Sequence, residues 1–155
     1  MGLAAFWAAA AAAEPPRAVG LAISGMSYVL ASSERSELVV EAQRAEVSPT
    51  TGRIALTGVR AELPGALDLV CGHGVLDLAA QEFFASGGVS GRTAAGSAFE
   101  TDRLRYRHAR GVVSSDTPVV WRENSQVFRG RGLEYFVRQG RLRLLGGASI
   151  SEESP

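Results

Sequence analysis

The chain has 155 residues, which is long enough for one domain with a substantial hydrophobic core. Its 16 basic and 16 acidic residues give a formal net charge of +0 at pH 7, so no whole-molecule field favours nucleic acid or an anionic membrane surface as a partner. The single cysteine, Cys71, excludes an internal disulfide and any metal site built from several cysteines.

Residues 1–13 are almost entirely apolar, and a proline-containing linker follows at residues 14–17. The apolar run is shorter than the roughly 20 residues that a helix needs to cross a bilayer core. Alanines at positions 11–13 fit the small-x-small pattern of signal-peptide cleavage, but no basic residue precedes the run. We interpret residues 1–17 as a truncated membrane anchor or a signal-like segment with its linker. An alanine-rich soluble helix is the third interpretation.

From residue 18 onward, short apolar runs alternate with turn residues. The run from Val19 to Leu30 predicts an entering strand with a bulge at Gly25. Four strand-turn-strand units follow, because equivalent apolar positions recur at intervals of 29 or 30 residues. In the order of the units, the outgoing strands align Val40, Val70, Phe99 and Phe128, and the return strands align Ile54, Phe84, Val113 and Leu142.

Each unit contains a step of three residues between apolar positions. The four steps are Ala42 to Ala45, Gly72 to Val75, Thr101 to Leu104 and Gly130 to Leu133. Because strand side chains alternate with period two, such a step requires a bulge or bend. A bend at the same level in every unit predicts an all-β, open, twisted jelly-roll of antiparallel strands, with two sheets facing each other across an apolar seam. This domain is expected to span residues 18–150, with a frayed tail at 151–155.

Residues with catalytic potential are scattered along the sequence. His73 and His108 belong to different units, and neither has a second histidine or cysteine at metal-ligand spacing, so both are interpreted as surface or edge residues. Cys71 is interpreted as a small, half-buried residue. The sequence therefore predicts a protein that is not an enzyme, with no catalytic residue, no metal and no cofactor.

Several short motifs, taken in their order and spacing, resemble the pattern of the LptC family. The resemblance runs from about Val19 to Ile150. The most telling pair is Phe99-x-Thr101-Asp102-x-Leu104-x-Tyr106 and Val113-Ser114-Ser115-Asp116-x-Pro118-Val119. The other matches are Ile23-Ser24-Gly25-Met26, Ala42 with Ala45-Glu46-Val47, Gly58-Val59, Gly88-Val89 and Gly130-x-Gly132-Leu133-Glu134.

LptC proteins are periplasmic bridge components of lipopolysaccharide export. The resemblance implies a β-jelly-roll that is anchored to the inner membrane by its N-terminus and accepts lipopolysaccharide from an inner-membrane ABC transporter. The lipid would then pass to an LptA-like bridge protein, joined to this one by β-augmentation of exposed edge strands. Acyl chains are expected in the apolar seam, whose predicted lining is Val40, Phe84, Phe99, Leu104, Tyr106, Val113, Phe128, Leu133, Tyr135, Leu142 and Leu144.

Two other functions fit the same sequence. The first is a soluble, LptA-like periplasmic bridge with a cleaved signal peptide. The second is a β-module that binds only protein partners, in which case the seam would be fully packed. The last unit is rich in arginine between Arg129 and Arg143, a pattern that fits either a solvated face or contact with lipid phosphates.

Overall fold

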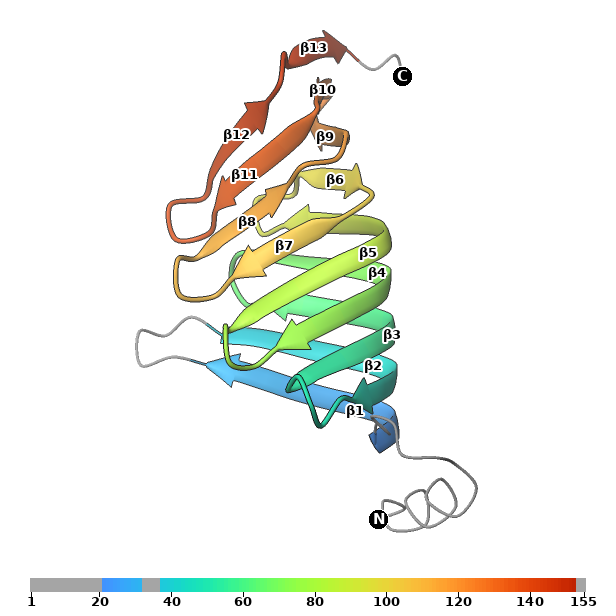
Figure 1. Cartoon of the computed structure of the whole chain (residues 1–155). Coiled ribbons are helices and arrows are strands. Elements are labelled where there is room, and N and C mark those ends of the chain that lie inside the picture. Colours follow the sequence, from blue (N-terminus) through green and yellow to red (C-terminus); the bar gives the residue numbers. More distant parts are fainter. Residues whose placement is uncertain (1–20, 32–36, 153–155) are drawn as a thin grey trace.

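The computed structural model of the chain describes residues 21–31 and 37–152. Within these ranges the backbone forms one antiparallel sheet of 13 strands and contains no helix (Figure 1). The predicted all-β, antiparallel architecture is therefore confirmed. The segment predicted for residues 1–17 lies outside the described residues.

The strands follow one another along the sheet, as hairpin-forming sequences predict. β1 to β5 pair as antiparallel neighbours in chain order, so the two strands of a hairpin lie side by side. In chain order the strands are β1 (Leu21–Ala31), β2 (Glu37–Val47), β3 (Arg53–Leu63), β4 (Leu67–Asp77), β5 (Glu82–Thr93), β6 (Ala98–Thr101), β7 (Leu104–Arg107), β8 (Val112–Ser115), β9 (Val119–Glu123), β10 (Gln126–Gly130), β11 (Gly132–Phe136), β12 (Arg141–Leu145) and β13 (Ser149–Glu152).

The pairing is interrupted once in each long strand, at a common level near its middle. Gly25 and Gln43 are left out of the β1–β2 register, and Gly58 and Gly72 are left out of the β3–β4 register. In β5 the interruption falls at residues 87–88, which are glycines with positive φ. Gly25 and Gly58 also have positive φ, a conformation that glycine adopts without steric penalty, so these positions let β1, β3 and β5 bend without breaking the ladder.

Beyond β5 the interruption becomes complete and the sheet divides into two branches. The end of β5 pairs with β6, which continues through β9 and β10 to β13, and we call this branch the first layer. The beginning of β5 pairs with β7, which continues through β8 and β11 to β12, and we call this branch the second layer. The halves of β2 to β5 on either side of the bend extend the two layers (Figure 1). The two layers face each other across the hydrophobic core.

In the second repeat unit, the residues that face inward lie one position before those that the sequence alignment predicted. Leu69 and Phe83 point inward and are 7% and 2% exposed, whereas Val70 is 52% exposed and Phe84 lies on the outer face. The guanidinium of Arg105 covers the ring of Phe84, 5.3 Å from its centroid. Phe84 is therefore not part of the apolar seam, and its neighbour Phe83 takes that place.

The reason for the displacement is the bulge in β5. Cys71 pairs with Val89 and His73 pairs with Ser86. At this level, one residue of β4 therefore lies opposite two residues of β5. One interval of the repeat has 30 residues and the others have 29. The sequence alignment placed the additional residue before β4, whereas in the structure it lies inside the bulge of β5. The same correction applies to the predicted step from residue 72 to residue 75, because the inward step in this unit runs from Cys71 to Gly74.

Three buried hydroxyl groups join the strands where the two layers divide. The hydroxyl of Thr101 lies 2.7 Å from that of Thr117 and 3.1 Å from that of Ser115. The Ser115 hydroxyl also accepts a hydrogen bond from the backbone N–H of Thr117, and the Thr117 hydroxyl accepts one from the N–H of Arg103. Buried polar groups are stable when they are paired in this way. The cluster explains why Thr101 and Ser115 occur in the two most specific motifs of the sequence.

Gly132 lies directly against the neighbouring strand. A Cβ atom at this position would collide with the carbonyl oxygen of Ser115 in β8. Because backbone atoms of a ladder cannot move aside cheaply, only glycine fits here. The glycine in the Gly130-x-Gly132-Leu133 motif therefore has a structural reason.

The inward position of Phe83 and the outward position of Phe84 can be tested by replacing each with alanine. Phe83→Ala removes a buried ring and is expected to lower the free energy of unfolding by about 3–5 kcal/mol. Phe84→Ala removes an outward ring and a contact with Arg105, and is expected to cost about 1 kcal/mol or less. Urea denaturation followed by circular dichroism measures both values. Equal losses, or a larger loss for Phe84→Ala, would contradict the observed facing.

Candidate functional site

The middle of the seam is packed shut. Side chains from both layers meet there, and the remaining space is about 10 Å³. Among them, Phe83, Leu104, Tyr106 and Val113 are each 5% exposed or less. A space of this size is no larger than a single water molecule and does not admit an alkyl chain.

The seam opens near the C-terminal end of the sheet. A cavity of about 550 Å³ lies between the first layer, from β9 and β10, and the second layer, from β11 and β12. We call it the C-terminal cavity. Its volume is in the range of small-molecule binding pockets. Its aromatic and aliphatic walls and its polar rim are formed by Thr93, Ala95, Gly96, Ser97, Trp121, Glu123, Asn124, Phe128, Tyr135, Gly140, Arg141 and Leu142.

Trp121 lines this cavity and is 3% exposed. Its ring stacks on Phe99 with a centroid distance of 5.5 Å and an interplanar angle of 11°. On the cavity side, the ring of Tyr135 lies 5.8 Å away at 40°. The indole N–H donates a hydrogen bond of 3.0 Å to the carboxylate of Glu123, and the hydroxyl of Ser97 lies 3.3 Å from the same oxygen. The indole is thus held in place by two aromatic rings and at its polar edge.

The predicted seam residues occupy two different environments. Val40, Phe99, Leu104, Tyr106, Val113 and Leu133 are buried in the core. Tyr135 is also nearly buried but lines the C-terminal cavity, together with the half-buried Phe128 and Leu142. Leu144 is half-buried against the core, and Phe84 lies on the outer face. Only part of the predicted set is therefore accessible to a ligand between the layers.

Sequence reasoning missed Trp121. The residue alternates with Val119, and both are buried, so the period-two pattern of this strand could have identified it. The positions equivalent to Trp121 in the other three units are Glu62, Arg92 and Ile150, so the repeat does not show a shared apolar residue there.

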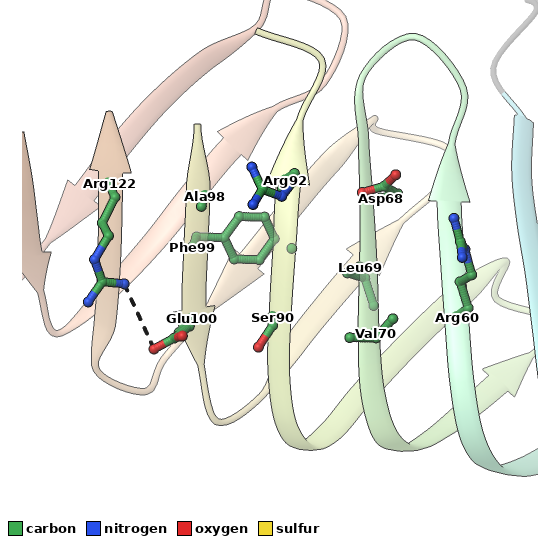
Figure 2. Close-up of a pocket in the computed structure, with 11 residues that line it drawn as sticks. Arg60, Asp68, Leu69, Val70, Ser90, Arg92, Ala98, Phe99, Glu100 and Arg122 are labelled. Carbon is green, nitrogen blue, oxygen red and sulfur yellow. Dashed lines mark ion pairs between the residues drawn. The ribbon is translucent and has the colours of Figure 1, made fainter. Parts of the chain in front are cut away.

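A shallower hollow of about 360 Å³ lies on the outer face of the first layer (Figure 2). Figure 2 shows Arg60, Arg92 and Arg122 around it, with the carboxylates of Asp68 and Glu100 between them. Arg122 approaches Glu100 at 4.0 Å. Charges of both signs line this hollow, and it lies outside the space between the two layers.

The thiol of Cys71 is buried in the core, where it is 8% exposed. Burial raises the pKa of the Cys71 thiol to about 11, so the thiol is protonated at neutral pH. Its S–H donates to the carbonyl oxygen of His73 at 3.1 Å. Among the described residues, no group of three or more histidine, cysteine or acidic side chains is placed to hold a metal ion.

His108 is buried, with 1% exposure, and is not a surface residue as the sequence suggested. Its Nδ1 lies 3.1 Å from the hydroxyl of Tyr106, and within the described part of the chain Nε2 has no hydrogen-bond partner. Burial, and secondarily the positive charge of Arg138, lower the pKa of His108. The imidazole is therefore held in its neutral form.

No protein-family model and no curated protein sequence matches the chain. Solved structures do match it, among them LptH from Pseudomonas aeruginosa, an LptA-homologous periplasmic component of the lipopolysaccharide transport device. The chain shares the LptH fold. The TM-score is 0.62 at 12% sequence identity, over 76% of this chain and 95% of LptH. The described residues contain no helix that is long and apolar enough to span a membrane.

The buried histidine predicts a pH dependence of stability. Unfolding returns His108 to its ordinary pKa near 6.5, so below about pH 6.5 the unfolded chain binds a proton that the folded chain does not. The contribution of His108 to stability is therefore complete above this pH and declines as the pH falls towards its lowered, folded-state pKa. Urea midpoints at about pH 7.5 and about pH 5.5 measure this decline.

Two histidine variants separate this effect from other titrations. His108→Gln is expected to flatten the decline, because the amide does not titrate. His73→Gln, at an exposed position, is expected to preserve it. An unchanged slope in His108→Gln would show that another group is responsible.

Proposed function

We propose that the protein is a lipopolysaccharide-binding bridge of the LptC type. It accepts lipopolysaccharide from an inner-membrane ABC transporter and passes it towards the outer membrane without a covalent step. The C-terminal cavity is the observation that carries the proposal, because it places a space with aromatic, aliphatic and polar side chains between the layers of a sheet that has the LptH fold. The order of the LptC-like motifs supports the assignment.

The cavity suits the apolar part of an amphiphile. Phe128, Tyr135 and Leu142 present apolar surface from both layers, and the polar rim leaves a headgroup in contact with water. Burial of apolar surface contributes about 25 cal/mol per Å², so even one partly inserted acyl chain gains several kcal/mol. A site open at its rim also allows the chain to leave in either direction. These are properties of a relay rather than of a storage protein.

The ends of the sheet support assembly with neighbouring bridge proteins. β1 is paired on one side by β2, and at the other end β13 is paired on one side by β10 (Figure 1). Both strands therefore offer backbone donors and acceptors to a partner strand, which is the requirement for β-augmentation. In β13 all four side chains are exposed, and Ile150 is 63% exposed. An LptA-like partner at this edge would cover it.

A soluble, LptA-like bridge is the second candidate, and the fold shared with LptH, an LptA homologue, favours it. The two candidates differ in attachment to the inner membrane. An LptC-type protein stays with the membrane pellet after a high-salt wash, whereas an LptA-like protein appears in the wash. Immunoblotting of the two fractions distinguishes them.

Photocrosslinking in living cells tests lipid binding. A benzoylphenylalanine at Phe128 or Leu142 is expected to form lipopolysaccharide adducts, because both side chains line the C-terminal cavity. The same probe at Leu78, an exposed residue in the turn after β4 that does not line this cavity, is the control and is expected to form none. Adducts are detected by a mobility shift and by anti-lipopolysaccharide blotting. Absence of adducts at both cavity positions, in cells with an active transporter, would refute lipid binding in this cavity.

A further inference from the structure

Glu123 places a carboxylate at the rim of the C-terminal cavity. It alternates with the buried Val119 and Trp121 in β9, so its side chain leaves the strand on the face that Trp121 presents to the cavity. One carboxylate oxygen accepts a hydrogen bond of 3.0 Å from the indole N–H of Trp121. The hydroxyl of Ser97, which also lines the cavity, donates to the same oxygen at 3.3 Å. These two contacts hold the carboxylate beside the indole.

No arginine among the described residues forms an ion pair with Glu123, and its second carboxylate oxygen accepts no hydrogen bond from them. Arg141 is the other charged residue of the cavity lining, but its guanidinium lies over the ring of Phe136, 4.9 Å from the centroid. Phe136 is its register partner, on the face of β11 and β12 opposite to Tyr135 and Leu142. The charge shown beside the space between the layers is therefore the negative charge of Glu123.

The chemistry of a carboxylate restricts which ligand groups can lie beside it. A carboxylate accepts hydrogen bonds and donates none, so a hydroxyl, an amide N–H or an ammonium group can bind to the free oxygen of Glu123. An anionic group such as a second carboxylate offers only acceptors and is repelled by the like charge. Glu123 is exposed, so water and salt screen this repulsion and keep the effect modest.

We infer that Glu123 determines the ligand preference of the C-terminal cavity. The cavity takes an amphiphile with a hydrogen-bond donor beside its alkyl chain, and it disfavours an amphiphile with an anionic group at that place. This inference rests on the proposed function and adds an orientation to it. In bound lipopolysaccharide, the anionic groups lie in water away from Glu123, and a neutral donor contacts its carboxylate.

Trp121 provides a reporter inside the cavity. The sequence contains two tryptophans, and Trp7→Phe leaves Trp121 as the only one. In this background, octylammonium, octanol and octanoate are titrated separately at neutral pH, below any micelle concentration. The three ligands have the same alkyl chain length, so their affinities differ through the polar group. Each affinity is taken from the midpoint of the fluorescence titration, because the amplitude also depends on the hydrogen bond of the indole.

Glu123→Gln removes the charge and retains an oxygen that accepts the indole N–H. This variant is expected to bind octanoate about two- to fivefold more tightly and octylammonium about two- to fivefold more weakly, the size of one solvent-accessible ion pair. Octanol, which is neutral, is expected to change less than either.

Glu100→Gln is the matched control. Glu100 belongs to the same layer, but it lies on the outer face near Arg122 and does not line the C-terminal cavity. Its replacement changes the net charge by the same amount and is expected to leave all three affinities unchanged. Circular dichroism checks that both variants are folded.

Each other outcome overturns the inference in a recognisable way. Equal shifts in Glu123→Gln and Glu100→Gln would show an effect of net charge, and shifts of the same sign for octanoate and octylammonium would show a change in cavity shape. Unchanged affinities in Glu123→Gln would show that the ligand does not contact this carboxylate.

The failure of this inference can be distinguished from failure of the proposed function. If no octyl ligand affects Trp121 while lipopolysaccharide adducts form at Phe128, the inference fails and the proposed function stands. If the adducts are also absent at both cavity positions, the proposed function fails with it.

Discussion

The structure depends on one constraint, which is that the interruptions of the long strands β1 to β5 all lie at the same level of the sheet. In an antiparallel ladder each strand takes its path from the hydrogen bonds of its neighbour, so a bend in one strand must be matched in the next. Glycines at positions 58 and 72, and the bulge at 87–88, provide the bends in β3 to β5. From β6 onward the same level separates whole strands. Two layers that face each other are the direct consequence, and the apolar seam is the space between them.

The division of the layers is stabilised by polar groups rather than by apolar ones. At this point the chain leaves one layer and enters the other, so backbone groups lose their ladder partners and require other ones. The hydroxyl groups of Thr101, Ser115 and Thr117 supply part of that pairing. The sequence pattern of threonine, serine and proline is typical of a turn. In the structure these residues lie at the place where the sheet divides into its two layers. The exposed Asp116, paired with Arg103 at 3.3 Å, lies on its solvent side.

The seam changes character along the sheet, and this difference bears on function. Its middle is filled by large side chains from both layers, including Phe83 and Tyr106, and behaves as the core of any globular domain. At its C-terminal end the layers enclose a cavity that is lined by Trp121, Phe128 and Tyr135 together with polar residues. In a lipid relay, the closed part holds the two layers together while the open part contacts the lipid.

The sequence by itself determined the local elements and their order. Alternating apolar residues, glycine and proline turns and an interval of 29 or 30 residues were enough to predict four antiparallel hairpins and a bent, two-layered sheet. These features depend on neighbouring residues, so a linear pattern contains them. It also identified Phe128, Tyr135 and Leu142, which line the C-terminal cavity.

Only the tertiary structure decided which apolar residues face inward in β5 and which part of the seam stays open. Phe83 and Phe84 are adjacent aromatic residues, and either could face inward. The bulge in β5 decides which one does, and this bulge is defined by the pairing with β4. The burial of His108 and the position of Trp121 depend on residues that are distant in sequence. The width of the space between the layers is set by side chains from strands far apart along the chain, because packing is a property of pairs of surfaces and not of one strand.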